Sequence, residues 1–136
     1  MTRYLLDSNA LNALINNHAV LVSRAEEARA RGSRLGTCEP VIAELYYGFE
    51  FSKSRDANIA RLEKGLRLIR VWPFDRAAAK EYGRVAAQLR RRSRPMQVID
   101  VMIAAIAMNL RNCTVVTTDS DLSAVQGLTT VNWAKE

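Results

Sequence analysis

The stretch Tyr4-Leu5-Leu6-Asp7-Ser8-Asn9, residues 4–9, decides the fold, because an apolar strand runs directly into an acid. Residues 3–6 predict a short strand, and Asp7 or Ser8 is suited to cap the helix that follows. An unpaired carboxylate beside a buried strand is costly. The opening therefore predicts a strand-to-helix unit and leaves two roles open for Asp7, a helix cap or a functional acid.

Short apolar strands alternate with helical stretches along the rest of the chain. Because parallel strands joined through helices bury both faces of a sheet, this order predicts the α/β class. We expect a single domain over residues 1–136, with a central, mainly parallel β-sheet of about five short strands flanked by helices. Strands are predicted at 3–6, 35–38, 68–72, 113–117 and 130–133, and helices after Asp7, at 20–31, from Pro40, and at 56–66, 75–92 and 99–110.

The composition is that of a basic globular protein. Hydrophobic residues make up 49% of the chain and charged residues 25%, and the formal net charge is +6. Excess positive charge favours a polyanionic partner, although a merely basic surface has the same composition. Asp7 interrupts the apolar start, unlike a signal peptide, and the longest apolar run, Val101–Met108, is too short to span a bilayer. We therefore expect a cytoplasmic protein with no membrane partner.

Four isolated acids, Asp7, Glu44, Asp100 and Asp119, adjoin apolar segments. Two follow predicted strands and two lie in early turns of predicted helices, so all four can face the edge where parallel strands end. Each has an ordinary explanation when taken alone, as a helix cap, a first-turn acid or a solvent-facing residue. Together they predict a site for one or two Mg²⁺ or Mn²⁺ ions, because hard divalent cations prefer oxygen ligands.

Other chemistries find less support in the sequence. The chain has one histidine, His18, so a pair of histidines for metal-free RNA cleavage is absent. An aspartyl nucleophile of the phosphatase type needs a second acid two residues after Asp7, where Asn9 stands. No Walker loop, GxGxxG motif, nucleophile elbow or cysteine–histidine zinc pattern occurs. Metal-dependent chemistry on a polyanion is the interpretation that remains.

Five successive segments resemble the PIN domain family, and in particular its VapC-type toxins. Leu5-Leu6-Asp7-Ser8-Asn9 is similar to the family's opening, with Ser8 in place of the usual threonine. Ile99 stands where many relatives have a polar residue before the third acid. The resembling segments are 5–9, 41–48, 94–105, 115–122 and 125–133, and they span nearly the whole chain in the family's order.

The resemblance implies an endoribonuclease toxin of a type II toxin–antitoxin pair that uses Mg²⁺ or Mn²⁺. It also implies a homodimer, and a small VapB-type antitoxin whose tail fills the active site in a hetero-oligomer. Transfer RNA is the favoured substrate, ahead of ribosomal RNA. A non-catalytic PIN-like nucleic-acid-binding or protein-interaction module stays open as an alternative, and so does DNA as the substrate.

Further residues are expected to support the four acids. Carboxylate ligands are themselves usually hydrogen-bonded, which indicates supporting roles for Ser8, Asn9 and Thr117, with helix capping and strand-end bonding as the alternative. Asp121 either replaces or assists Asp119. The arginines before the third acid are expected to grip RNA phosphates, although a basic run at a helix end is also a common solvated feature. They are Arg90, Arg91, Arg92 and Arg94.

Overall fold

The computed structural model describes residues 1–135, and its five strands form one sheet with only parallel neighbours. The strands lie in the spatial order β3-β2-β1-β4-β5. The predicted α/β class with a mainly parallel sheet is therefore confirmed. The strands are β1 (Arg3–Leu6), β2 (Arg34–Cys38), β3 (Arg70–Trp72), β4 (Cys113–Val116) and β5 (Thr129–Val131).

Six α-helices connect the strands in residues 1–135, and local sequence signals start several of them. Asp7 caps the first helix, where its Oδ1 accepts from the Ala10 amide at 2.9 Å, and Asp75 caps the fifth in the same way through Ala78. Pro40 lies in the first turn of the third, where no amide donor is needed. The helices are α1 (Ser8–Ile15), α2 (Ala19–Ala30), α3 (Glu39–Phe49), α4 (Arg55–Leu66), α5 (Arg76–Arg91) and α6 (Val98–Leu110).

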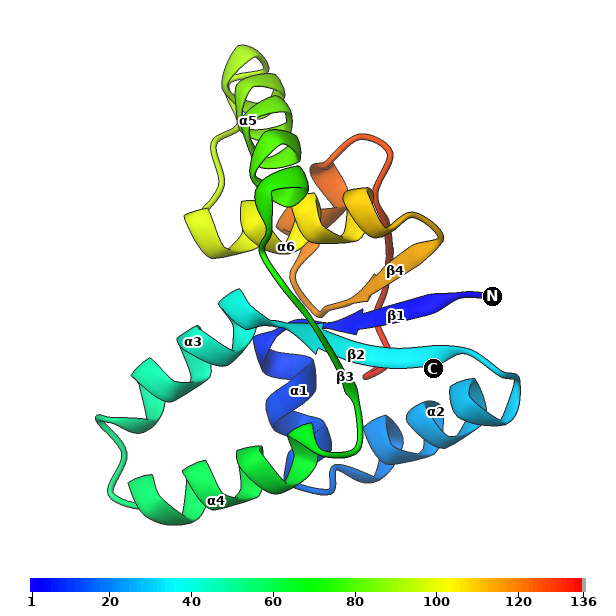
Figure 1. Ribbon diagram of the computed structural model, residues 1–136, viewed down its shortest axis with the longest axis vertical. Coiled ribbons are helices and arrows are strands. Elements are labelled where there is room, and N and C mark those ends of the chain that lie inside the picture. Colours follow the sequence, from blue (N-terminus) through cyan, green and yellow to red (C-terminus); the bar gives the residue numbers. More distant parts are fainter. Residues whose placement is uncertain (136) are drawn as a thin grey trace.

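The helices form two layers around the sheet, which Figure 1 shows nearly edge-on. Helices α5 and α6 pack closely together above it, while α1 and α2 cover the opposite face. Helices α3 and α4 form a hairpin that extends away from the strands, and α4 packs against α1. Because each face is covered, the central strands are buried on both sides, as their near-continuous apolar sequences predict.

The core lies where β1 and β4 pair between the two helical layers. Leu5, Leu6 and Val115 are fully buried, and Leu11 of α1 and Ile103 of α6 close over them from opposite faces. Burying each such side chain contributes about 1.5–3 kcal/mol. Within the described part of the chain, every helix is too short or too polar to cross a lipid bilayer.

Several strand boundaries differ from the sequence-based expectations, and one element was not expected. Strand β3 begins at Arg70, later than expected, because Leu68 is 70% exposed and its amide closes a turn onto Gly65 at 3.0 Å. Strand β5 ends at Val131, because Trp133 packs its ring against Tyr4 with centroids 5.0 Å apart. A short 3₁₀ helix, η1 (Ser120–Ala124), follows β4 and was not predicted.

Gly36 allows the neighbouring strands β2 and β3 to approach each other closely. A Cβ atom added at this position would come within 2.7 Å of both the Arg70 carbonyl oxygen and the Trp72 ring. We expect Gly36→Ala to lower the free energy of unfolding by about 1–3 kcal/mol through this overlap. Gly48→Ala in α3 is the matched control, since nothing lies within 4 Å of its added Cβ and helix propensity favours alanine. Urea denaturation of the two variants checks the prediction, and equal stabilities would contradict it.

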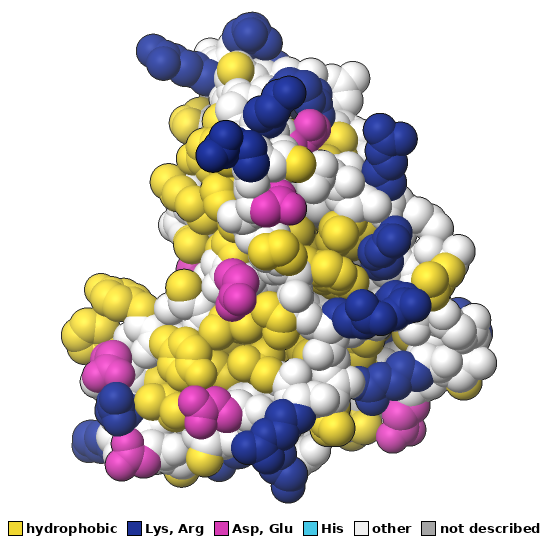
Figure 2. Space-filling model, viewed as in Figure 1, with side chains coloured by type: hydrophobic (Ala, Val, Ile, Leu, Met, Phe, Trp, Pro, Cys, Tyr) yellow, Lys and Arg dark blue, Asp and Glu magenta, His cyan; other side chains and the backbone are white. Residues whose placement is uncertain are grey.

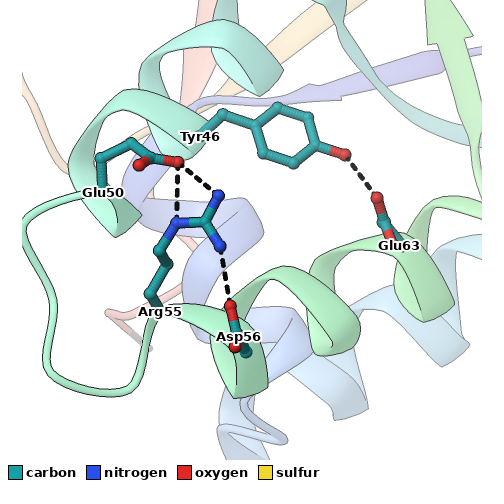
Figure 3. Close-up of polar contacts among 5 residues, drawn as sticks. All are labelled: Tyr46, Glu50, Arg55, Asp56 and Glu63. Carbon is teal, nitrogen blue, oxygen red and sulfur yellow. Dashed lines mark hydrogen bonds and ion pairs between the residues drawn. The ribbon is translucent and has the colours of Figure 1, made fainter.

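Polar contacts hold the α3–α4 hairpin together, as Figure 3 shows. Arg55 at the start of α4 binds one carboxylate oxygen of Glu50 through Nε and Nη2, both at 2.9 Å, and also pairs with Asp56 at 2.7 Å. The Tyr46 hydroxyl donates to Glu63 at 3.1 Å. Exposed pairs contribute roughly 0–1 kcal/mol each, so this network orients the hairpin more than it stabilises the fold.

Candidate functional site

The candidate site lies at the point where the strand order reverses. From β1 the chain crosses to β2 on one side, whereas β4 lies on the other side of β1 and leads outward to β5. In open α/β sheets, such a switch point leaves an opening at the carboxyl ends of the strands, where ligands bind. Asp7 directly follows β1 and Asp119 comes soon after β4, so two of the four predicted acids lie at this opening.

Asp7 is the most enclosed of the four acids, with only 6% of its surface exposed. Burial raises the pKa of its carboxyl group, while hydrogen bonds from Thr117 and from the Ala10 amide act to lower it. The charges of Asp119 and Glu44 raise the pKa further. Asp7 is therefore a helix cap and also a partly desolvated member of an acidic group, so the cap is confirmed and the functional role stays a prediction.

Glu44 reaches the site from α3. Its carboxylate accepts a hydrogen bond from the Ser8 hydroxyl. Because Ser8 begins α1 immediately after Asp7, this bond joins α3 to the carboxyl end of β1. Glu44 is exposed, but its helix is anchored by Val41 and Leu45, which are buried against the core. The rigid element thus holds a solvent-facing carboxylate beside Asp7.

Asp100 lies in the first turn of α6 and is half-buried. Burial raises its pKa to about 6, and the charges of Asp119, Glu44 and Asp7 contribute in that order. A first-turn acid at a helix N-terminus ordinarily gains stability from the helix dipole. The upward shift shows that burial and repulsion from the other acids outweigh that effect here.

Asp119 and Asp121 make different contacts. Asp119 caps η1, where its Oδ1 accepts from the Asp121 amide at 2.8 Å, and its own amide donates to the Thr117 hydroxyl at 2.9 Å. Asp121 is more exposed, and its carboxylate lies 3.8 Å from Arg94 Nη2. Asp119 heads the charges that raise the pKa of Asp100, and Asp121 contributes least. Asp119 is therefore the better fourth member of the acidic group.

The four acids form one electrostatic group at the carboxyl edge of the sheet. Within residues 1–135, no three Asp, Glu, His or Cys side chains are drawn together closely enough to form a metal cluster as they stand. Burial is the main cause of the raised pKa values of Asp7 and Asp100, and the charges of the neighbouring carboxylates raise both pKa values further. All the donors are carboxylate oxygens, which Mg²⁺ and Mn²⁺ prefer, and a cation would relieve the repulsion. The donor set therefore fits a hard divalent ion.

The residues predicted to support the acids differ in whether they contact a carboxylate. Ser8 and Thr117 contact Glu44 and Asp7 respectively, as supporting residues would. Asn9 is exposed, and among residues 1–135 its side chain makes no hydrogen bond to a carboxylate. Contacts with the acids are therefore found for Ser8 and Thr117 but not for Asn9, and the supporting role of Asn9 stays a prediction.

The predicted phosphate-binding arginines lie at the end of α5 and in the loop before α6. Arg90 and Arg91 are exposed in the last helical turn. Arg92 donates to the Ala124 carbonyl at 3.1 Å, and Arg94 pairs with Asp121. These contacts bring the basic run beside η1, next to the acidic group. RNA binding by these arginines stays a prediction.

Comparisons with known proteins identify the family and confirm the fold. The PIN domain family model matches residues 4–128. The tRNA(fMet)-specific endonuclease VapC of Shigella flexneri is 31% identical over 135 residues, which cover 98% of this chain and 100% of that protein.

Two solved structures have the same fold over nearly their full length. The VapBC2 structure from Rickettsia felis, bound to a promoter DNA fragment, has a TM-score of 0.88 at 26% identity, covering 97% of this chain and 99% of that one. DNA-bound VapBC from Salmonella typhimurium has a TM-score of 0.87 at 27% identity, covering 98% and 99%. The resemblance inferred from the sequence motifs is thus confirmed, and the chain belongs to the PIN domain family, within its VapC branch.

Proposed function

We propose that this protein is the endoribonuclease toxin of a VapBC-type toxin–antitoxin pair and that it requires Mg²⁺ or Mn²⁺. The observation that carries the proposal is the convergence of four carboxylates from four segments at the carboxyl edge of the sheet, where burial first and the neighbouring charges second raise the pKa of Asp100 to about 6. Holding such a group together is costly for a fold that does not use it. The VapC ribonuclease relatives support RNA as the substrate.

Asp7, Glu44, Asp100 and Asp119 would hold one or two ions, some of them through water, since Mg²⁺ binds few carboxylates directly. When bound, a divalent cation makes a water more acidic and offsets charge that develops on the phosphoryl oxygens. The chain itself supplies orientation: Ser8 fixes the carboxylate of Glu44, and Thr117 fixes that of Asp7. Because the acids repel RNA, Arg90, Arg91, Arg92 and Arg94 are proposed to hold phosphates flanking the scissile bond.

Transfer RNA is the proposed target, and a small VapB-type protein the proposed inhibitor. The named specificity of the Shigella flexneri relative supports the first, and the VapBC complexes among the similar structures support the second. A homodimer that forms a hetero-oligomer with the antitoxin is proposed on the family resemblance. Size-exclusion chromatography with light scattering tests the homodimer, and a monomer at micromolar concentration would contradict it.

The first test is cleavage of total cellular RNA by the purified protein with and without Mg²⁺. We expect cuts in tRNA that require the metal and stop on addition of a chelator. Hydrolysis by a water molecule leaves a 5′-phosphate and a 3′-hydroxyl, which mapping of the cut ends detects. A 2′,3′-cyclic phosphate would instead show attack by the ribose hydroxyl and would contradict the proposed route. Cleavage of DNA with equal efficiency would contradict the assignment to RNA.

A further inference from the structure

The opposite edge of the sheet carries a row of arginines. Three neighbouring strands, β1, β2 and β3, each begin with an arginine: Arg3, Arg34 and Arg70. Arg3 and Arg34 are direct partners in the parallel register, so their backbones are about 4.8 Å apart. The sheet thus has an acidic group where its strands end and a basic row where they begin.

Two further arginines complete a basic hollow beside this row. Arg29 of α2 and Arg67, between α4 and β3, line a depression of about 310 Å³ together with Arg34 and Arg70. Arg29 is fixed in place because its Nη2 donates to the Leu68 carbonyl at 2.9 Å. Figure 2 shows Lys and Arg side chains gathered on the side of the molecule where β1 and β2 begin, at the right of the view.

Among the residues that the structure describes, no carboxylate pairs with the arginines of the hollow. Within residues 1–135, none of Arg29, Arg34, Arg67 and Arg70 has an Asp or Glu oxygen within 4.0 Å, whereas Arg31, Arg55, Arg84 and Arg94 all do. Like charges crowded at one edge repel one another, and an anion with several charges relieves that repulsion. Guanidinium groups bind phosphate oxygens in paired hydrogen bonds. The hollow therefore has the chemistry of a phosphate site.

We propose that this basic hollow binds the phosphate backbone of the RNA substrate at a distance from the bond that is cut. The inference rests on the proposed ribonuclease function. Strand β2 has five residues, so the hollow and the acidic group are separated by about 17 Å along the sheet. A folded RNA is large enough to contact both edges, whereas a dinucleotide at the acids cannot reach the hollow.

RNA fits the hollow better than an acidic protein segment does. The acidic group repels phosphates, so much of the attraction for RNA has to arise elsewhere on this surface of net charge +6. Four of the eight residues that line the hollow are arginines, and its apolar part is limited to Leu35, Leu68 and Ile69. An apolar groove between α1, α2 and α4 does adjoin it and shares Arg29, Leu68 and Ile69, so antitoxin binding is measured as the competing outcome.

The test uses Arg67→Glu/Arg70→Glu, because both side chains are exposed and make no hydrogen bond within residues 1–135. The matched control is Lys53→Glu/Lys80→Glu, which makes the same charge change at exposed positions on other elements. Both pairs are placed in the Asp7→Asn protein, which should bind RNA without cutting it. Binding of unfractionated tRNA and of a dinucleotide is measured over a range of salt concentrations, alongside binding of the antitoxin.

We expect the arginine double variant to bind tRNA about tenfold more weakly, with a salt slope reduced by about two, and to bind the dinucleotide as before. The lysine control should change tRNA binding much less. Equal losses in both variants would reduce the effect to net charge and overturn the proposal, as would unchanged tRNA binding. Weakened antitoxin binding with unchanged tRNA binding would assign the hollow to the protein partner. A wild-type protein that does not cut RNA with Mg²⁺ would instead refute the proposed function.

Discussion

Asp7→Asn is expected to lower kcat/KM for RNA cleavage by about a thousandfold or more, equivalent to about 4 kcal/mol of transition-state stabilisation. Asparagine has nearly the same shape, but it removes the negative charge from the most enclosed of the four acids. Its side-chain oxygen can still accept from the Ala10 amide, so the cap of α1 and the fold should persist. Single-turnover cleavage of tRNA at saturating Mg²⁺ measures the loss.

The control for this prediction is Asp56→Asn, which removes an acid that is 91% exposed and distant from the site in the α3–α4 hairpin. This variant should cut RNA at nearly the wild-type rate. Thermal unfolding of both variants separates lost chemistry from lost structure. An Asp7→Asn protein that folds and still cuts RNA within tenfold of wild type would remove Asp7 from the catalytic group.

Asp100→Asn is expected to stabilise the protein at pH 7.5 in buffer containing a chelator. The carboxyl group has a pKa near 3.8 in the unfolded chain and about 6 in the folded protein, so its ionisation opposes folding. The full difference corresponds to roughly 3 kcal/mol, and solvent screening of this half-buried group reduces it to about 1–2 kcal/mol. Urea denaturation should therefore show the variant to be more stable by that amount.

The direction of this effect can be checked from how the free energy of unfolding depends on pH. Above pH 6 the wild-type carboxylate is charged in both states and the cost of burying it is fully present. As the pH falls from about 6 towards 4 the folded protein takes up a proton before the unfolded chain does, so the wild type gains stability relative to Asp100→Asn. The two stability curves should meet near pH 4, and Mn²⁺ at pH 7.5 should stabilise the wild type more than the variant. If the stability curves of the two proteins stay parallel from pH 4 to 8, they would contradict the raised pKa of Asp100.

The sequence predicted the fold well where local signals were strong. The apolar runs of β1 and β4 each end at an acid or a threonine, and capping by Asp7 and Asp75 follows from residue type and position alone. The start of β3 was missed because Leu68 is apolar yet exposed, and apolar character alone does not show which side chains are covered. The pairing of Arg94 with Asp121 joins the loop before α6 to η1 and has no local signature.

The acidic site was easier to anticipate than the basic hollow, and strand order explains why. Residues that follow parallel strands share one edge whatever the order, so the acids could be grouped before the topology was known. The arginines of the hollow come from α2, from β2, and from β3 and the residues just before it. Arg34 and Arg70 lie close together because β2 and β3 are neighbours in the sheet. The sequence does show an arginine at the start of each of these strands. Whether those arginines form a cluster depends on which strands are neighbours in the sheet.

The pairing of β1 with β4 has a consequence for how this protein is made. Arg3 at the start of the chain pairs with Cys113 near its end, and Asp100 and Asp119 are both translated late. A nascent chain on the ribosome can form the α1–α4 region but cannot complete the sheet until β4 emerges, and contacts so distant in sequence form slowly. A product that terminates before Asp100 therefore lacks two of the four acids, and such an incomplete copy should be harmless to the cell that synthesises it.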